Sequence, residues 1–183
     1  MPTGMSKLVI RKVGVVGAGV MGSGIAAHMA NAGLEVVMLD MQDFAKGGLE
    51  KAVKARPAAF YDKSRARLVT TGNVDTDLAK LASCDLVIEA IIEKLEPKQA
   101  LFEKLEKILP AHAVVASNTS GLRIADMMKG RGDGFKKRFL VMHFFNPVRY
   151  MKLLEIVAGP DTAPDTVAQI KRFGEDADRK SVV

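Results

Sequence analysis

Histidine is the side chain best able to move a proton near neutral pH, and the chain contains three. His28 lies in an apolar helical stretch and His112 in a connection, so we assign neither a chemical role. His143 lies at the end of an apolar, strand-like run, and Glu155 lies in the next such run. On neighbouring strands the carboxylate would hold the imidazole tautomer, raise its basicity and leave the other nitrogen free to accept a proton. Such a pair could dehydrogenate an alcohol if a hydride acceptor lay nearby; without the carboxylate, His143 would be an ordinary core residue.

A glycine-rich loop near the start of the chain predicts that hydride acceptor. Gly17, Gly19 and Gly22 have the spacing G-x-G-x-x-G, after the apolar run 13–16 and before a helical pattern that ends near Asn31. The first glycine permits a tight turn, the second lets a diphosphate approach the backbone, and the third lets the helix pack close to the strand. The helix N-terminus then attracts the diphosphate. The residues expected to contact the dinucleotide here are Gly17, Ala18, Gly19, Val20, Met21 and Gly22.

The acid at the end of the second apolar run indicates which dinucleotide is bound. Asp40 lies 18 residues after Gly22, directly after the run 36–39. A carboxylate at this point accepts hydrogen bonds from a ribose 2′-hydroxyl and repels a 2′-phosphate, so NAD is favoured over NADP. Two alternatives are a glycine-rich turn without a ligand and a membrane segment. The agreement of strand, helix and acid disfavours the first, and five glycines within residues 13–30 disfavour the second.

Strand-like and helical patterns alternate along the whole chain. This alternation predicts an α/β fold, a Rossmann-like, mostly parallel sheet with helices on both faces and right-handed crossovers. We interpret residues 70–73 as a turn and 129–138 as a loop. The expected strands are 13–16, 36–39, 85–90, 113–116, 139–145 and 153–157, and the expected helices are 20–31, 43–60, 75–82, 99–109, 124–128 and 161–178.

Polar side chains follow several of these strands. Ligands of open α/β sheets bind at the carboxyl ends of the strands, so the side chains there should converge on one crevice. This set consists of Asp40, Glu89, Glu93, Asn118, Ser120, His143 and Asn146.

The length of 183 residues fits one domain. The single cysteine, Cys84, excludes a disulfide framework and suits a reducing compartment, and the apolar run within residues 1–11 is too short for a signal peptide, so we expect a cytoplasmic protein. We interpret residues 1–11 as a leader or tag remnant and 12–183 as the domain. A strand-like pattern that begins near 181 suggests a piece of a longer protein.

Positive charge is concentrated in residues 46–67, which carry seven basic and two acidic side chains. Such a field attracts a polyanion. A phosphate-rich small molecule and a merely solvated helix face both remain open, whereas a nucleic acid is disfavoured because the segment has few aromatic residues and no recognised binding motif.

Five stretches taken together resemble the 3-hydroxyacyl-CoA dehydrogenases of fatty-acid β-oxidation: VGVVGAGVMGSGIA, DLVIEAIIEKLEPKQALFEKL, ASNTSGL, HFFNP and MKLLEIV. The resemblance implies oxidation of (3S)-hydroxyacyl-CoA to 3-ketoacyl-CoA with NAD. It also implies that this Rossmann-like domain precedes a mostly helical C-terminal domain, which closes the cleft and mediates dimerisation. The full-length protein is therefore expected to be a homo-oligomer, and the isolated domain to be poorly active.

The resemblance also implies roles for individual residues. By matched motif, His143 is the general base, Glu155 its partner, Ser120 a contact of substrate and nicotinamide, and Asn146 a group that polarises the reacting oxygen near the cofactor. No metal is implied. The alternative role for Ser120, a cap of the turn that follows it, stays open.

Three further positions are matched less firmly. Glu93 and Lys98 correspond to a glutamate and a lysine near the cofactor, although Lys98 could be a solvated helix charge. Lys63, in the basic segment, is our choice for a coenzyme A contact.

Two departures from the family pattern bear on the subgroup. Gly121 replaces a second serine or threonine, as in large members that also carry a hydratase domain, and residues 40–85 form a shorter segment than in compact mitochondrial-type enzymes. Competing hypotheses are a dehydrogenase of a hydroxyacid without coenzyme A or of carnitine type, and a non-catalytic NAD-binding protein.

Overall fold

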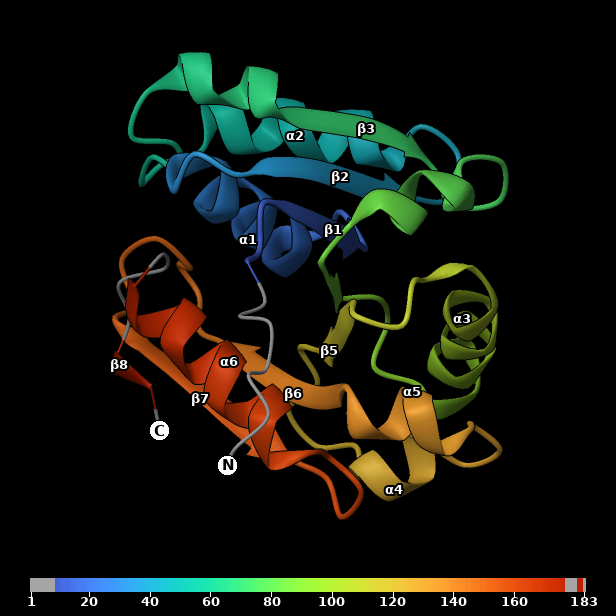
Figure 1. Ribbon diagram of the computed structural model, residues 1–183. Helices are drawn as coiled ribbons and strands as arrows, with labels where there is room; N and C mark the ends of the chain where they lie inside the picture. Colours follow the sequence, from blue (N-terminus) through green and yellow to red (C-terminus); the bar gives the residue numbers. More distant parts are fainter. Residues whose placement is uncertain (1–8, 177–180, 183) are drawn as a thin grey trace.

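The computed structural model describes residues 9–176 and 181–182, and within them one sheet has the strand order β3-β2-β1-β4-β5-β6-β7-β8 (Figure 1). All neighbouring strands are parallel except β6 and β7, which confirms the mostly parallel, Rossmann-like prediction. The strands are β1 (Lys12–Val16), β2 (Glu35–Asp40), β3 (Val69–Asn73), β4 (Leu86–Glu89), β5 (Val114–Ser117), β6 (Phe139–Phe144), β7 (Leu153–Ala158) and β8 (Ser181–Val182).

Helices cover both faces of this sheet, as predicted. One apolar core contains buried residues of α1, α2 and α6, and the other contains buried residues of α3, α4, α5 and η2. Successive strand residues point to opposite faces, so Ile88 belongs to the first core and Val87 to the second. The helices are α1 (Val20–Asn31), α2 (Phe44–Lys54), η1 (Lys63–Leu68), η2 (Leu78–Ser83), α3 (Leu95–Ile108), α4 (Ile124–Met127), α5 (Asp133–Lys137) and α6 (Pro164–Asp176).

The order of the strands reverses beside β1. The chain runs outward from β1 to β2 and β3, then returns to place β4 on the other side of β1. Loops that leave β1 and β4 therefore part in opposite directions, and the carboxyl edge between them is the usual ligand crevice of such sheets. The glycine loop lies at this edge.

Four elements differ from the sequence-based expectation. Residues 70–73 are not a turn but most of β3, an edge strand that pairs with β2. Its sequence is polar because only Val69 is buried, and a Cβ at Gly72 would lie 2.7 Å from an oxygen of Asp77. Likewise, residues 129–138 are not all loop, since α5 forms within them around buried Phe135.

The helix expected to reach residue 60 is also too long. Helix α2 ends at Lys54, shortly before Pro57, whose ring and missing N–H are incompatible with a helix interior. The stretch 75–82 contains a 3-10 helix, η2, rather than an α-helix.

Lys12 begins β1, where the domain was expected to begin. The proposed leader lies largely outside the described residues, because residues 1–8 are not described. Burial raises the pKa of the Cys84 thiol to about 11, in keeping with a core residue. Within the described ranges, no helix is long and apolar enough to cross a bilayer.

Candidate active site

The predicted His143–Glu155 pair is formed across the antiparallel β6–β7 ladder. The two residues are direct partners in the register, and Nδ1 of His143 lies 2.7 Å from Oε2 of Glu155. The carboxylate accepts the Nδ1 proton, so the tautomer that fits this geometry has a lone pair on Nε2. His143 remains 20% exposed at its side chain, and it lines a hollow together with Ser120 and Glu155. The arrangement suits a general base.

Ser120 lies on the other side of the imidazole ring. Its Oγ is 3.0 Å from Nε2 of His143 and can donate its proton to that nitrogen. Ser120 belongs to the loop that follows β5, and Asn118 Oδ1 ties the same loop to β6 by accepting the Phe144 N–H at 2.9 Å. Ser120 therefore has a contact beyond any role in capping a turn.

The loop that carries Ser120 is held by Glu93. Oε1 of Glu93 accepts the backbone N–H of Ser120 at 3.1 Å, the more distant N–H of Gly121, and the hydroxyl proton of Thr119. Burial raises the pKa of Glu93, but the hydrogen bond from Thr119 and the charge of Lys98 outweigh burial, and the pKa is lowered overall. The carboxylate is therefore ionised at neutral pH.

Lys98 is buried beside two carboxylates. It is 1% exposed, and its Nζ lies 2.5 Å from Glu89 Oε1 and 3.2 Å from Glu93 Oε2. It is therefore not a solvated helix charge, and its place near the cofactor stays a prediction. Glu89, fully buried at the end of β4, also accepts the Ser117 hydroxyl at 2.5 Å and the Ile91 N–H at 2.7 Å.

The His143–Glu155 pair opens into a cavity of about 430 Å³ that extends from the loop after β5 across β6 and β7. Ser120, His143 and Glu155 supply its polar wall, and Val157, which is half exposed, supplies part of the apolar wall. A cavity with one polar corner and apolar sides suits a substrate with a single reacting oxygen and a hydrocarbon tail.

The glycine loop fits a dinucleotide. An added Cβ at Gly17, where φ is +105°, would lie 2.3 Å from the Ala90 carbonyl oxygen, and one at Gly22 would lie 1.8 Å from the Gly17 carbonyl oxygen, so the fold itself requires both glycines. Gly19 is different. Its backbone angles are ordinary, and an added Cβ would meet nothing within 4 Å. The fold does not need Gly19, but a diphosphate approaching the N-terminus of α1 does.

Asp40 is positioned to serve the ribose. It ends β2, and its Oδ2 accepts the Ala18 N–H at 2.6 Å while Oδ1 accepts the Met41 N–H at 2.6 Å. Each oxygen keeps a further lone pair for a ribose hydroxyl. Val20, at the start of α1, is 72% exposed beside the loop, whereas Met21 packs partly against the core.

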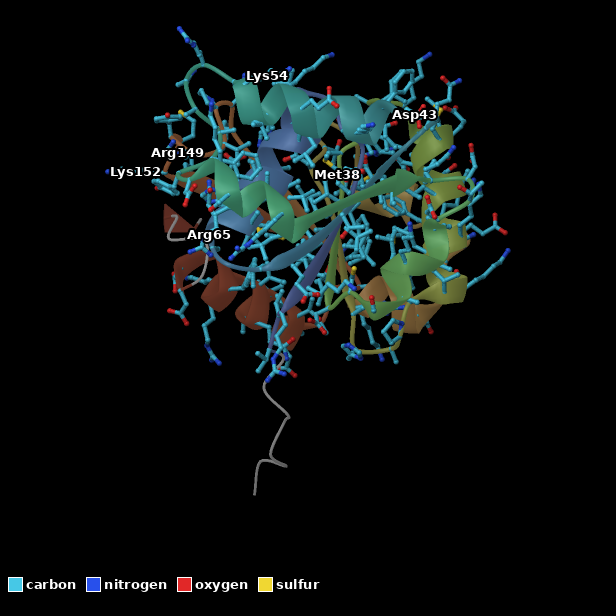
Figure 2. The ribbon with its side chains drawn as sticks, turned by 90° about the horizontal axis from the view of Figure 1, so that it is seen from above. Met38, Asp43, Lys54, Arg65, Arg149 and Lys152 are labelled. Atoms are coloured by element: carbon cyan, nitrogen blue, oxygen red, sulfur yellow. The ribbon has the colours of Figure 1, made fainter. Side chains whose placement is uncertain are left out.

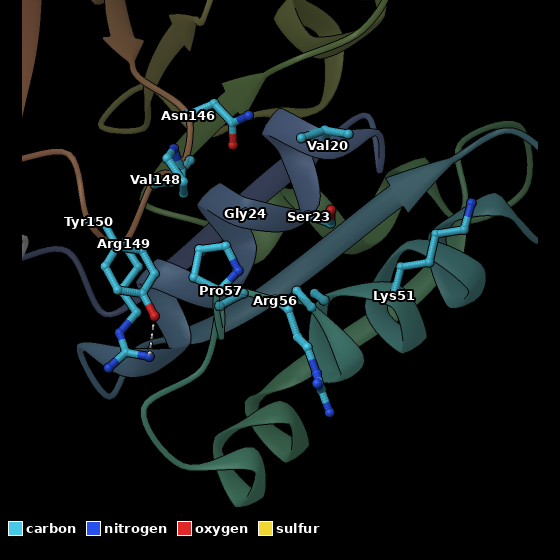
Figure 3. Close-up of a pocket in the computed structure, with 14 residues that line it drawn as sticks. Val20, Ser23, Gly24, Lys51, Arg56, Pro57, Asn146, Val148, Arg149 and Tyr150 are labelled. Carbon is cyan, nitrogen blue, oxygen red and sulfur yellow. Dashed lines mark hydrogen bonds between the residues drawn. The ribbon is translucent and has the colours of Figure 1, made fainter.

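A second hollow, of about 300 Å³, lies between α1, the end of α2 and the segment that follows β6 (Figure 3). Lys51 and Arg56 lie on its α2 side, and Asn146 lies on the opposite side. Asn146 thus borders this second hollow rather than the cavity of His143. Arg149 closes one end, because its guanidinium donates to the carbonyl oxygens of Ala58 and Phe60 and stacks on Tyr61 at 3.9 Å.

Lys63 is not brought to either cavity. It begins η1, which precedes β3 and therefore lies toward the amino ends of the strands. Figure 2 shows Lys54, Arg65, Arg149 and Lys152 on one side of the molecule and Asp43 on the other. Lys51 and Arg56, rather than Lys63, are the members of the basic segment that line a hollow.

The remaining histidines lie away from this edge, as expected. His28 is buried within α1, and His112 is exposed, with Nε2 3.4 Å from an oxygen of Asp85.

A base that can receive a proton and a loop that can receive a dinucleotide, at one edge of a Rossmann-like sheet, are the parts that NAD-dependent dehydrogenation of an alcohol requires. Comparison with known proteins narrows this class. Residues 12–183 match the family described as "3-hydroxyacyl-CoA dehydrogenase, NAD binding domain". The chain belongs to this family.

Several relatives have related names. A probable 3-hydroxyacyl-CoA dehydrogenase of Deinococcus radiodurans is 47% identical over 95% of this chain, and the mitochondrial hydroxyacyl-coenzyme A dehydrogenase of Homo sapiens is 35% identical over 92%. A putative fatty acid oxidation complex trifunctional enzyme of Rickettsia felis is 39% identical over 90%. The chain spans 53%, 57% and 24% of these proteins, respectively.

Solved structures agree with this assignment. The crystal structure of (S)-3-hydroxybutyryl-CoA dehydrogenase from Ralstonia eutropha superposes with a TM-score of 0.82 at 33% identity, covering 96% of this chain and 63% of the other. FadB2 of M. tuberculosis gives a TM-score of 0.81 at 36% identity, covering 95% and 63%.

Proposed function

We propose that the protein containing this chain oxidises (3S)-3-hydroxyacyl-CoA thioesters to 3-ketoacyl-CoA with NAD, as a step of fatty-acid β-oxidation. The observation that carries the proposal is the imidazole of His143, held by Glu155 at Nδ1 and contacted by Ser120 at Nε2. Proteins named for this activity share the fold and a third or more of the sequence.

In this reaction, residues of the chain accept the proton and stabilise the charge that forms. NAD, when bound at the glycine loop, supplies the acceptor for the hydride from C3. Nε2 of His143 accepts the hydroxyl proton as the C3–O bond becomes a carbonyl, and Glu155 stabilises the imidazolium that results. The Ser120 hydroxyl, which donates to Nε2 without substrate, can turn its proton to the reacting oxygen. One hydride and one proton leave the alcohol, so the step is balanced.

The basic hollow supports a coenzyme A thioester as the substrate. Lys51 and Arg56 line this hollow on its α2 side, and Asn146 lines it on the opposite side. A thioester with C3 at His143 and its phosphates at Lys51 and Arg56 would cross the carboxyl edge of the sheet at Asn146. In this arrangement Asn146 can donate its amide protons to the thioester or to the reacting oxygen.

Three properties of the whole protein belong to the same proposal. Coverage of only part of each relative fits a Rossmann-like domain, residues 12–183, followed in the complete protein by a helical domain that closes the cleft and forms a homo-oligomer. The buried single thiol, Cys84, fits a cytoplasmic protein. The chain resembles both single enzymes and trifunctional ones, so the accompanying domains are to be read from the complete sequence.

The experiment that tests this function compares substrates in the full-length protein. Reduced NAD, followed by absorbance, is expected to form with (3S)-3-hydroxybutyryl-CoA and longer acyl chains, and far more slowly with the (3R) isomer. Free 3-hydroxybutyrate and carnitine are the controls for the competing dehydrogenases. Equal rates with and without coenzyme A would refute the assigned substrate class, and binding of NAD without any turnover would favour a non-catalytic protein.

A further inference from the structure

A series of ion pairs and hydrogen bonds connects two buried charged residues to His143. Glu89 contacts Lys98, Lys98 contacts Glu93, Glu93 holds the backbone of Ser120, and Ser120 contacts His143. We propose that Glu89 and Lys98 are positioning residues for the Ser120–His143 pair, and that they act through Glu93 and the loop 117–121. The inference rests on the proposed dehydrogenase function and assigns both residues a role that neither motif nor sequence position indicated.

Strand register explains why this network forms. Glu89 ends β4 and lies opposite Ser117 at the end of β5, and Val141, two residues before His143, lies opposite Ser117 on β6. Since alternate residues of a strand point to the same face, Glu89, Ser117 and His143 all point to the face covered by α3. Helix α3 carries Lys98 on that face. The network is thus built into four adjoining elements.

The desolvation cost of the Glu89–Lys98 pair indicates that the pair does more than stabilise the fold. Glu89 is 0% exposed and Lys98 is 1% exposed, and moving two charges out of water has a desolvation cost that their attraction often fails to exceed. Apolar residues of similar volume commonly stabilise a fold at least as much as a buried ion pair does. The pair instead satisfies further polar groups, because Glu89 accepts the Ser117 hydroxyl and the Ile91 N–H. What the ion pair adds is a fixed direction for each carboxylate.

Lys98 fixes the direction of Glu93. The two oxygens of Glu93 have different partners. Oε2 lies 3.2 Å from Lys98 Nζ, and Oε1 accepts hydrogen bonds from Thr119, Ser120 and Gly121. Half of the Glu93 side chain is exposed, so water would compete for it without the lysine. Removing the charge of Lys98 frees Glu93 to rotate and leaves the loop N–H groups without their acceptor.

A second route reaches the same loop. The Ser117 hydroxyl donates to Glu89 Oε2 and also accepts the Thr119 N–H at 3.2 Å. Glu89 therefore anchors the loop from its first residue while Glu93 anchors it near Ser120. A shift of the loop would lengthen the 3.0 Å contact between Ser120 and His143. A displacement of roughly 1 Å at reacting groups is able to cost about 100-fold in rate.

The test uses the full-length protein with Glu89→Gln/Lys98→Met, which removes both buried charges together and leaves neither unpaired. We expect kcat to fall about 10- to 100-fold with little change in KM for NAD. The matched control is Lys107→Met, because Lys107 forms an exposed pair with Glu103 on the same helix. Glu93→Gln, at an exposed position, repeats the test in a variant that leaves the buried pair intact.

A second readout does not depend on turnover. In protein labelled with ¹⁵N-histidine, the Nε2 resonance of His143 reports its contact with Ser120, and Ser120→Ala provides the reference for its loss. We expect Glu89→Gln/Lys98→Met and Glu93→Gln to move this resonance toward the Ser120→Ala value, and Lys107→Met to leave it unchanged. A protein without dehydrogenase activity would fail the kinetic arm alone, whereas the resonance would still decide the positioning role.

Two results would overturn the inference. In the first, the double variant keeps both the kcat and the Nε2 resonance of the wild type, which would make the buried pair structural only. In the second, NAD affinity is lost while the His143 resonance stays in place, which would return Lys98 to the cofactor site.

Discussion

Single replacements of glycine by alanine can separate what the fold requires from what the dinucleotide requires. At Gly22 an added methyl group would lie 1.8 Å from the Gly17 carbonyl oxygen, and at Gly17 it would lie 2.3 Å from the Ala90 carbonyl oxygen. At Gly19 it would meet no atom within 4 Å. The first two changes should damage the fold, and the third should damage only binding.

The structure sets the size of each effect. Gly19 is the N-cap of α1, where alanine in place of glycine costs about 1 kcal/mol or less, or about 2–4 °C in Tm for a chain of this size. At Gly22 the backbone itself must move, so the free energy of unfolding should fall by about 3 kcal/mol or more, the upper range of overpacking. Gly19→Ala nevertheless places a methyl group where the diphosphate must lie, and NAD affinity should fall at least about tenfold, or 1.4 kcal/mol.

Thermal unfolding followed by circular dichroism measures the first effect, and calorimetric titration with NAD measures the second. A Gly19→Ala variant that binds NAD as tightly as the wild type would refute the placement of the diphosphate. A Gly22→Ala variant with an unchanged Tm would refute the close approach of α1 to the end of β1.

The remaining predictions concern other parts of the site. The pKa of Glu93 is lowered below its ordinary 4.5, so the stabilising effect of its carboxylate is complete above pH 4.5. This effect is lost as the pH falls through the lowered pKa. The Tm difference between wild type and Glu93→Gln should therefore vanish in acid. Arg149→Met removes the guanidinium contacts to residues 58–61 and should lower the free energy of unfolding by about 1–2 kcal/mol in urea titrations, with Arg149→Lys intermediate. Lys51→Glu should raise the KM for acyl-CoA roughly fivefold or more while Lys63→Glu leaves it unchanged, and equal effects would contradict the assignment of the basic hollow.

Local sequence patterns predicted the parts of the site that depend on residues close together in the chain. The glycine spacing and Asp40 follow from one strand–helix–strand unit, so their roles could be predicted without knowledge of the rest. His143 and Glu155 could be paired because two consecutive strands with a short connection commonly lie side by side. Their antiparallel register then depends on the hairpin alone.

Other features depend on elements that are distant in sequence. The sequence around Lys98 is that of a solvated helix, and its burial follows only when α3 packs over the ends of β4 and β5, where Glu89 and Ser117 meet. The signal available in the sequence was Glu89 itself, a charge at the end of an apolar strand. Strand β3 was missed for a similar reason, since an edge strand with little burial has no apolar pattern to reveal it.

The role of Lys63 as a coenzyme A contact stays a prediction, although the residue lines neither hollow. Net charge identifies a basic segment but does not tell which of its side chains faces a cavity. That choice depends on where α2 ends, and α2 ends at Lys54, earlier than its pattern indicates.

The most direct measurement of the central claim is the rate of reduced NAD formation from (3S)-3-hydroxybutyryl-CoA by His143→Gln in the full-length protein, with His112→Gln as the matched control at an exposed histidine outside the site. The account predicts that kcat falls by about 10²- to 10⁴-fold for His143→Gln, the usual cost of losing a general base, and stays at the wild-type value for His112→Gln. A His143→Gln variant that folds, binds NAD and turns over at the wild-type rate would contradict it.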